Sequence, residues 1–316
     1  MKISIITCFH NSGARIAAYA RALQGLDCSG FDVEVILVDN ASKDATRENL
    51  KRLSADLSIP AQVVVEERPG LMYARCAGIA AAAGEYAVFF DDDNEPQSDY
   101  LQALRRLTAR YPDAVAFTGN AVLPPEYAEQ SRLGPALSLL AVRRERGEKD
   151  LPLVNFCPQP MVIGAGMIVH SALMRDACNA WMQGSRTIVG RTGDRPLGGE
   201  EIWLLHYMTK EGGRAVFSDS LTLVHRIEKG RFEEAYLCRL GYEYGFLQPQ
   251  LAREIRRFKP GLRFSYPSGW RGLSVAALRV MVAVVRQLFR PSRGGAAITA
   301  HRCGMLIALM QDSKRE

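Results

Sequence analysis

The first 120 residues alternate between short apolar runs rich in β-branched residues and longer stretches with helical periodicity. Runs of the first kind are typical of strands, and stretches of the second kind are typical of helices. The strand-like runs are residues 2–7, 33–38, 62–66, 86–90 and 114–118, and the helix-like stretches are residues 14–24, 44–57, 71–83 and 98–111. Two of the runs are apolar at consecutive positions, as expected when both faces of a sheet are covered. This order predicts an α/β domain with a mostly parallel sheet flanked by helices.

The alternation of strand-like and helix-like segments becomes less regular after residue 118. Residues 119–160 are rich in Pro, Glu and Arg and predict a long excursion. Residues 161–169 are strand-like but contain Gly164 and Gly166, which indicates a close approach of the backbone to another group. Residues 183–199 lack a clear periodicity, and a loop of that length in a compact domain is usually functional or mobile.

The carboxyl-terminal part of the chain is basic. Residues 229–316 contain 16 Lys and Arg against 6 Asp and Glu, a net charge of +10 in a chain whose total is +6. The apolar stretches of residues 272–289 are interrupted by arginine and are shorter than the ~20 residues of a spanning helix. We therefore expect a first domain at residues 1–230 and a helical extension at residues 231–316. Residues 270–310 should lie in the plane of an anionic membrane, or else pack on the first domain or a second subunit.

Several classes of protein are disfavoured. The seven cysteines are scattered without metal-ligand spacing, and we expect reduced thiols. The apolar run between Lys2 and Cys8 is too brief for a secretory signal, so we expect a cytoplasmic protein, either free or peripheral on the cytoplasmic membrane face. The basic tail has no recognised nucleic-acid module, and we expect no nucleic-acid partner.

The most informative segment is a buried strand-like run that leads directly into Asp91, Asp92 and Asp93. In an extended chain Asp91 and Asp93 point to the same face, which holds two like charges close together. Hard oxygen ligands of this kind suit a divalent metal, Mn²⁺ or Mg²⁺, that also binds phosphate oxygens. An acidic turn that caps the following helix is the alternative.

Other polar residues end neighbouring strands. Asp39 can accept hydrogen bonds from a ribose or a nucleobase, although an Asx-turn or a helix cap explains it equally well. Gly70 and Arg75 open a helix whose amino end can face phosphates, and a surface ion pair is the alternative for Arg75. Ligands of parallel sheets bind outside the carboxyl ends of the strands. Three polar segments should meet there: residues 7–11, 39–42 and 91–94.

Two further elements carry candidate chemistry. Glu200 and Glu201 precede a helix-like stretch, and because successive helical residues point about 100° apart, only one can aim at a given centre. A helix amino end favours an ionised carboxylate, as a general base requires, although simple helix capping is as consistent. His225 follows an apolar run. Alone it would more often be structural, but beside an acidic metal site it is the natural nitrogen ligand.

Taken in order, these motifs resemble the family-2 glycosyltransferases with the GT-A (Rossmann-like) fold. The resemblance covers roughly residues 2–230. It rests on Ile5-Ile6-Thr7 with Asn11 and Ser12, Val38 to Ser42, Gly70 with Ala74-Arg75 and Gly78-Ile79, Gly84-Glu85-Tyr86 leading to Asp91-Asp92-Asp93, and Gly199 to Leu204.

The resemblance implies a role for each matched residue. Asp93 and His225 would be metal ligands, and the catalytic base would be Glu201, in a position often held by Asp, or else Glu200. The longer side chain of Glu201 leaves that choice open, whereas Cys76, where Asn is common, puts little in doubt. The implied contacts with the nucleotide-sugar are Thr7, Phe9, Asn11, Asp39, Asn40, Gly70, Arg75, Asp91, Asp92, Gly164 and Gly166.

The implied reaction is an inverting transfer of a sugar from a nucleoside-diphosphate donor, with a UDP-sugar favoured, to the hydroxyl of a glycan or lipid-linked acceptor. We expect it in cell-surface glycan or polysaccharide synthesis. A sugar nucleotidyltransferase would want a glycine-rich, basic loop after the first strand, and residues 8–13 are not one. A catalytically inactive GT-A-fold binding protein is the other alternative, disfavoured by the intact acidic cluster. The acceptor, the sugar and the oligomeric state are left open.

Overall fold

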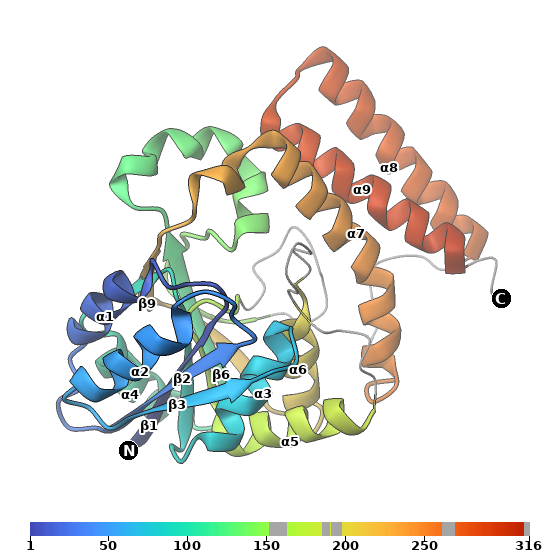
Figure 1. The fold of residues 1–316 in the computed structure, drawn as a ribbon. Coiled ribbons are helices and arrows are strands. Elements are labelled where there is room, and N and C mark those ends of the chain that lie inside the picture. Colours follow the sequence, from blue (N-terminus) through green and yellow to red (C-terminus); the bar gives the residue numbers. More distant parts are fainter. Residues whose placement is uncertain (152–162, 185–189, 191–197, 261–268, 313–316) are drawn as a thin grey trace.

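The computed structural model describes residues 1–151, 163–184, 190, 198–260 and 269–312 (Figure 1). Cys157, most of the irregular segment at residues 183–199 and the start of the strand expected at residues 161–169 lie outside the described residues. The described strands form one sheet in the order β3-β2-β1-β4-β8-β6-β9-β5, with β7 beside β9. They are β1 (Lys2–Phe9), β2 (Asp32–Asn40), β3 (Ala61–Glu66), β4 (Tyr86–Asp91), β5 (Asn94–Pro96), β6 (Ala114–Val122), β7 (Glu148–Asp150), β8 (Met167–His170) and β9 (Arg214–His225).

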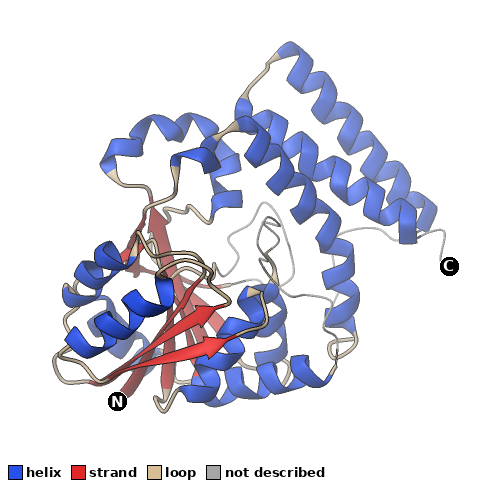
Figure 2. Cartoon of the chain, viewed as in Figure 1, coloured by secondary structure: helices blue, strands red, loops and turns tan. Residues whose placement is uncertain are grey.

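The amino-terminal half is a parallel sheet. Strands β1 to β4 pair in parallel and alternate with α1 (Ile16–Gln24), α2 (Thr46–Asp56) and α3 (Leu71–Ala81). Consecutive residues of β1 point to opposite faces: Ile5 and Ile6 are both fully buried and belong to separate hydrophobic cores. The consecutive apolar positions therefore reflect helices on both faces of the sheet (Figure 2).

The second half of the sheet is mixed. Strand β8 lies antiparallel to both β4 and β6, whereas β9 runs parallel to β6 and antiparallel to β5. The longest ladders are the parallel ones, so the predicted α/β class with a mostly parallel sheet is confirmed. The remaining elements of this half are α4 (Tyr100–Arg110), the 3₁₀ segment η1 (Pro125–Leu140), α5 (Ser171–Gln183) and α6 (Glu200–Met208).

The expected helical extension is present at the carboxyl terminus. Helices α7 and α9 pack closely, and a Cβ at Gly245 would lie only 1.9 Å from the carbonyl oxygen of His301, so only glycine fits there. Among the helices of the described residues, none combines the length and the apolar character needed to cross a membrane. The elements are η2 (Lys229–Phe232), α7 (Glu234–Arg256), α8 (Gly269–Phe289) and α9 (Arg293–Asp312).

Candidate functional site

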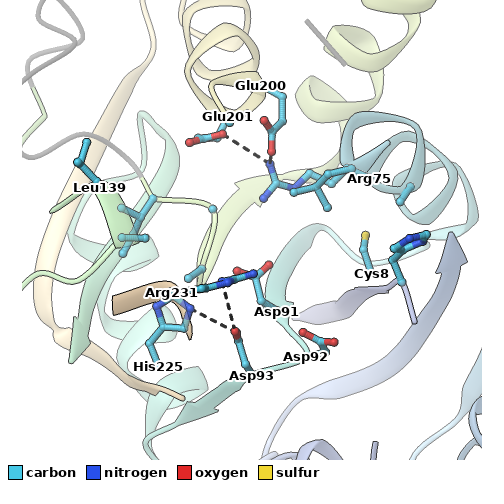
Figure 3. A pocket seen from close by; sticks show the side chains of 18 of the residues that line it. Cys8, Arg75, Asp91, Asp92, Asp93, Leu139, Glu200, Glu201, His225 and Arg231 are labelled. Carbon is cyan, nitrogen blue, oxygen red and sulfur yellow. Dashed lines mark hydrogen bonds and ion pairs between the residues drawn. The ribbon is translucent and has the colours of Figure 1, made fainter. Parts of the chain in front are cut away.

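A cavity of about 560 Å³ lies at the carboxyl ends of the parallel strands (Figure 3). The three segments expected to meet at this edge all contribute to its lining. Its walls also include the start of α6, the segment around the end of η1, and helices α7 and α9. The cavity is thus formed where the parallel sheet meets the helical extension.

One side of the cavity carries the acidic cluster. Asp91 ends β4, and His225 ends β9 opposite Asn94 of β5, so the pairing of β5 with β9 brings the histidine to the carboxylates. One ligand atom from each of Asp91, Asp93 and His225 lies within 4.8 Å of the other two. His225 Nε2 is 3.4 Å from Asp93 Oδ1, whereas the buried Nδ1 has no hydrogen-bond partner among the described residues. Two carboxylates and an imidazole with an unsatisfied nitrogen fit a divalent cation such as Mn²⁺.

Two arginines that the sequence analysis did not single out lie beside this cluster. Arg15 Nε donates to Asp92 Oδ2 at 2.9 Å, and Arg231 NH1 lies 3.9 Å from Asp93 Oδ2. Burial raises the pKa of Asp92, the charge of Asp93 raises it further, and Arg15 opposes both. Neither arginine lies in a recognisable motif. Only the folded arrangement of the chain brings these positive charges to the carboxylates.

The other side of the cavity carries Glu200 and Glu201, at the amino end of α6 (Figure 3). Arg75 NH1 donates to Glu200 Oε1 at 2.9 Å and lies 3.9 Å from Glu201 Oε2. The side chains of Arg75 and Glu200 are only 3% and 2% exposed, so the alternative of a surface ion pair for Arg75 is wrong. Burial lowers the pKa of Arg75, but the two glutamates outweigh it and the net shift is upward. Glu201 remains the more accessible carboxylate, at 13% exposure.

The two glycines of the segment before β8 lie against other side chains. A Cβ at Gly164 would lie 2.2 Å from Arg75 NH2, so this glycine makes room for the guanidinium. Gly166 has a φ of +71°, and its carbonyl accepts a hydrogen bond from the hydroxyl of Tyr100 at 2.6 Å. Gly164 lines the cavity, whereas Gly166 lies outside its described lining. A contact of either residue with a donor stays a prediction.

Two of the residues expected to contact the nucleotide, Thr7 and Asp39, are fully buried and lie outside the described lining of the cavity. Thr7 Oγ1 donates to the hydroxyl of Tyr19 at 2.8 Å. Asp39 Oδ2 accepts from Arg47 Nε at 2.6 Å, and its Oδ1 accepts from the backbone N–H of Ser42 at 3.3 Å. The turn contact considered as the alternative for Asp39 is therefore present. Contacts of Thr7 and Asp39 with a nucleoside stay predictions.

The other expected contacts on this side line the cavity. Asn40 joins two of its segments, because its Oδ1 accepts from the backbone N–H of Gly70 at 2.9 Å and its Nδ2 donates to the carbonyl of Arg68 at 2.7 Å. It thereby holds the start of α3 against the end of β2. The expected residues that line the cavity are Phe9, Asn11, Asn40, Gly70, Arg75, Asp91, Asp92, Asp93, Gly164, Glu200, Glu201 and His225.

The far wall comes from residues to which the sequence analysis gave no role. Gln248 of α7 and His301 of α9 lie 3.0 Å apart between Nε2 atoms. Burial lowers the pKa of His301 to about 4, so the ring is neutral at pH 7. Arg143 donates to Thr118 Oγ1 at 3.2 Å, and burial lowers its pKa to about 10. Gln248 and His301 reach this wall only because the extension folds back over the sheet, which no local motif predicts.

The order of the sheet and the cavity at the carboxyl ends of its parallel strands agree with the GT-A fold. The family model described as glycosyl transferase family 2 matches residues 4–168, and the chain belongs to that family. It is therefore a family-2 glycosyltransferase, as the sequence motifs predicted.

Curated relatives are similar over part of the chain. A cholesterol galactosyltransferase of Borreliella burgdorferi is 29% identical over 103 residues, which are 33% of this chain and 28% of that protein. A putative teichuronic acid biosynthesis glycosyltransferase, TuaG of Bacillus subtilis, is 29% identical over 121 residues, 38% of this chain and 47% of that protein. Each of these matches spans less than half of the relative's own length.

Solved structures match over nearly the whole chain. The mannosyltransferase PcManGT of Pyrobaculum calidifontis, in complex with GDP-Man and Mn²⁺, superposes with a TM-score of 0.59 at 17% identity, covering 98% of this chain and 87% of that one. TarS 1–349 of S. aureus, in complex with UDP-GlcNAc, has a TM-score of 0.53 at 15% identity, covering 100% and 92%. At this level of identity the similarity shows the GT-A fold alone.

Proposed function

We propose that this chain transfers a sugar from a nucleoside-diphosphate donor to an acceptor hydroxyl with inversion at the anomeric carbon. The observation that carries the proposal is a single cavity with two carboxylate centres (Figure 3). One centre, Asp91 and Asp93 with His225, has the donor set of a cation site. The other, Glu200 and Glu201, lies at the opposite side and offers a proton acceptor. A metal-assisted group transfer needs both functions at one substrate.

Asp91, Asp93 and His225 are the proposed holders of Mn²⁺ or Mg²⁺. When bound, such a cation neutralises charge on the departing diphosphate. Support comes from the mixed oxygen and nitrogen donors and from the unsatisfied His225 Nδ1. Arg15, paired with Asp92, and Arg231, near Asp93, add positive charge at this side of the cavity, and we propose that they attract the diphosphate as well.

Glu201 is the proposed base. It takes the proton of the acceptor hydroxyl while that oxygen bonds to the anomeric carbon and the bond from this carbon to the diphosphate oxygen breaks, the electron pair leaving with the diphosphate. Arg75 binds Glu200 more closely than Glu201, at 2.9 Å against 3.9 Å. Glu201 is therefore the carboxylate with more freedom to accept a proton, and Glu200 positions the arginine.

The donor contacts are proposed from the residues that line the same cavity. Phe9, Asn11, Asn40 and Gly70 would contact the nucleotide, with Thr7 and Asp39 behind them. We propose a UDP-sugar as the donor. TarS was solved with UDP-GlcNAc, and PcManGT, a mannosyltransferase, with GDP-Man, so GDP-sugars belong in the same test.

The biological setting is proposed from the relatives and the basic tail. Residues 1–230 carry most of the transfer site, and residues 231–316 complete its far wall through Gln248 and His301. We propose a role in cell-surface glycan or polysaccharide synthesis, as the name of the relative TuaG suggests. The acceptor would be a glycan or a lipid-linked sugar, reached from the cytoplasm with peripheral membrane contact through residues 270–310, of which α8 is exposed whereas α9 packs on α7 and α8.

The test is a thermal-shift screen of UDP-, GDP- and dTDP-sugars with Mn²⁺ or with EDTA, followed by nucleotide release from the best ligand. A donor that binds only the folded state raises its melting temperature. We expect a metal-dependent rise and slow release of the nucleoside diphosphate. If a donor bound without any turnover in the presence of acceptors, an inactive binding protein would be indicated. Release of pyrophosphate from a nucleoside triphosphate and a sugar phosphate would indicate a nucleotidyltransferase.

A further inference from the structure

Helix α8 presents a wide apolar face to solvent. Of the thirteen exposed large hydrophobic residues in the described part of the chain, eight lie on this helix, and Leu288 and Phe289 reach 75% and 82% exposure. Soluble proteins rarely leave so continuous an apolar surface without a partner. The eight residues are Val275, Leu278, Met281, Val282, Val284, Val285, Leu288 and Phe289.

This face points away from the rest of the molecule. Helix α8 packs on α9, and its buried residues Ala276 and Ala283 lie seven positions apart on one side. At about 100° per residue, Leu278 and Val285 point about 200° away from those alanines. Figure 1 accordingly shows α8 at the outer edge of the molecule, beyond α9.

The charges around the face are of one sign. The sequence between residues 260 and 311 has seven arginines and no Asp or Glu. Arg279, Arg286 and Arg290 follow one another at helical spacing along one edge of the apolar face. Arg302 of α9 joins this edge, because its guanidinium donates to the carbonyl oxygen of Arg279 at 3.2 Å. An apolar face bordered by arginines is typical of helices that lie in the interface of an anionic bilayer.

We propose that the outward face of α8 docks on an anionic lipid bilayer, with Leu278, Val282 and Val285 in the acyl boundary and Arg279 and Arg286 at the headgroups. A second copy of the chain is a poorer occupant, because two such faces bring together arginines with no acidic residue on either helix to neutralise them. Anionic headgroups provide those counter-charges.

The docked orientation also brings the bilayer near the cavity. Helix α9 lies between α7 and α8 (Figure 1), and its His301 lines the cavity. Packed helices lie 8–10 Å apart, so the lipid surface would lie roughly 20 Å from the cavity wall. A lipid-linked acceptor sugar would then be within reach. This last step rests on the proposed transferase function, whereas lipid docking does not.

The first experiment is flotation of the full chain with vesicles of phosphatidylcholine and phosphatidylglycerol, and with vesicles of phosphatidylcholine alone. We expect binding to the anionic vesicles that weakens as salt screens the arginines. Val282→Gln should lower the partition coefficient about tenfold, because a half-exposed valine no longer buries apolar area in lipid. Val65→Gln is the matched control, because Val65 on β3 is 41% exposed and far from α8 in the sequence.

The charge contribution is tested separately. Arg286→Gln should lower partitioning onto anionic vesicles about fivefold and leave phosphatidylcholine binding unchanged, and Arg52→Gln on α2 is its control. Both positions are exposed, so the melting temperature should not move. Equal binding to the two kinds of vesicle would overturn the proposal. The proposal would also be overturned if the wild type did not bind vesicles but formed a dimer in sedimentation velocity, and Val282→Gln dissociated that dimer. Flotation needs no turnover, so an inactive enzyme that still binds vesicles would refute only the transferase proposal.

Discussion

Arg75 of α3 and Glu200 of α6 form a buried ion pair that joins the parallel half of the fold to the helix carrying the candidate base. Their atoms lie 2.9 Å apart, and both side chains are almost inaccessible to solvent. The pair joins the start of α6 to α3, and Glu201 follows Glu200 directly at that start. A buried charge left without its partner is strongly unfavourable, so this contact ties stability to the geometry of the site.

The first prediction concerns that pair. Arg75→Met should destabilise the fold by about 3–5 kcal/mol, because Glu200 would remain buried without its arginine. Urea unfolding measures the change. The double variant Arg75→Met/Glu200→Gln should recover part of the loss, because neither charge is then stranded. If the double variant lost as much as the sum of the two single variants, the coupling proposed here would be absent.

The second prediction concerns the cation site. Asp93→Asn and His225→Ala should each weaken Mn²⁺-dependent donor binding by at least ~10-fold, because each removes one of three ligands. Asp56→Asn on the exposed side of α2 is the control. Calorimetric titration with donor, with and without Mn²⁺, gives the affinities. Unchanged donor affinity in EDTA would rule out a metal role in binding.

The third prediction concerns pH. Burial, with a smaller effect of Arg302, lowers the pKa of His301 from 6.5 to about 4, so the unfolded chain takes up a proton in this window and the folded chain does not. The stability that the folded protein gains from keeping His301 neutral is therefore complete above pH 6.5 and is lost as the pH falls toward 4. Between about pH 7 and pH 5 it amounts to about 2 kcal/mol.

His301→Gln should remove that part of the pH dependence, and glutamine keeps an acceptor for Gln248. Denaturant unfolding of both proteins at each pH isolates the effect, because the other titrating groups are common to both. Parallel stability profiles for the variant and the wild type would show that His301 titrates normally in the folded protein.

How far the sequence predicted the site depends on how local each feature is. Asp91 and Asp93 directly follow the buried residues of β4, so their position at the edge of the sheet could be predicted from the strand pattern alone. His225 could be proposed as their partner from ligand chemistry and from the resemblance, but not placed beside them from the strand pattern, because the pairing of β5 with β9 is not local.

The burial of Thr7 could have been predicted from the sequence, whereas the far wall of the cavity could not. Thr7 shares one face of β1 with Ile5 and Phe9, which indicates a buried position, and it does contact Tyr19 of α1 on that face. The far wall had no such signal. His301 reaches the cavity because α9 packs against Gly245 of α7, and the crossing of two helices depends on the whole extension.

The last prediction concerns Glu201 as the catalytic base. Glu201→Gln keeps the size of the side chain but removes its ability to take a proton. Donor binding, read as the melting-temperature rise with Mn²⁺, should be unchanged, while turnover should fall by roughly 10²- to 10⁴-fold. Glu200→Gln should act more mildly, through Arg75, and Glu211→Gln at an exposed site after α6 should have no effect. Near-normal turnover of Glu201→Gln beside an inactive Glu200→Gln would reverse the assignment, and full activity of both would contradict acid–base catalysis at this site.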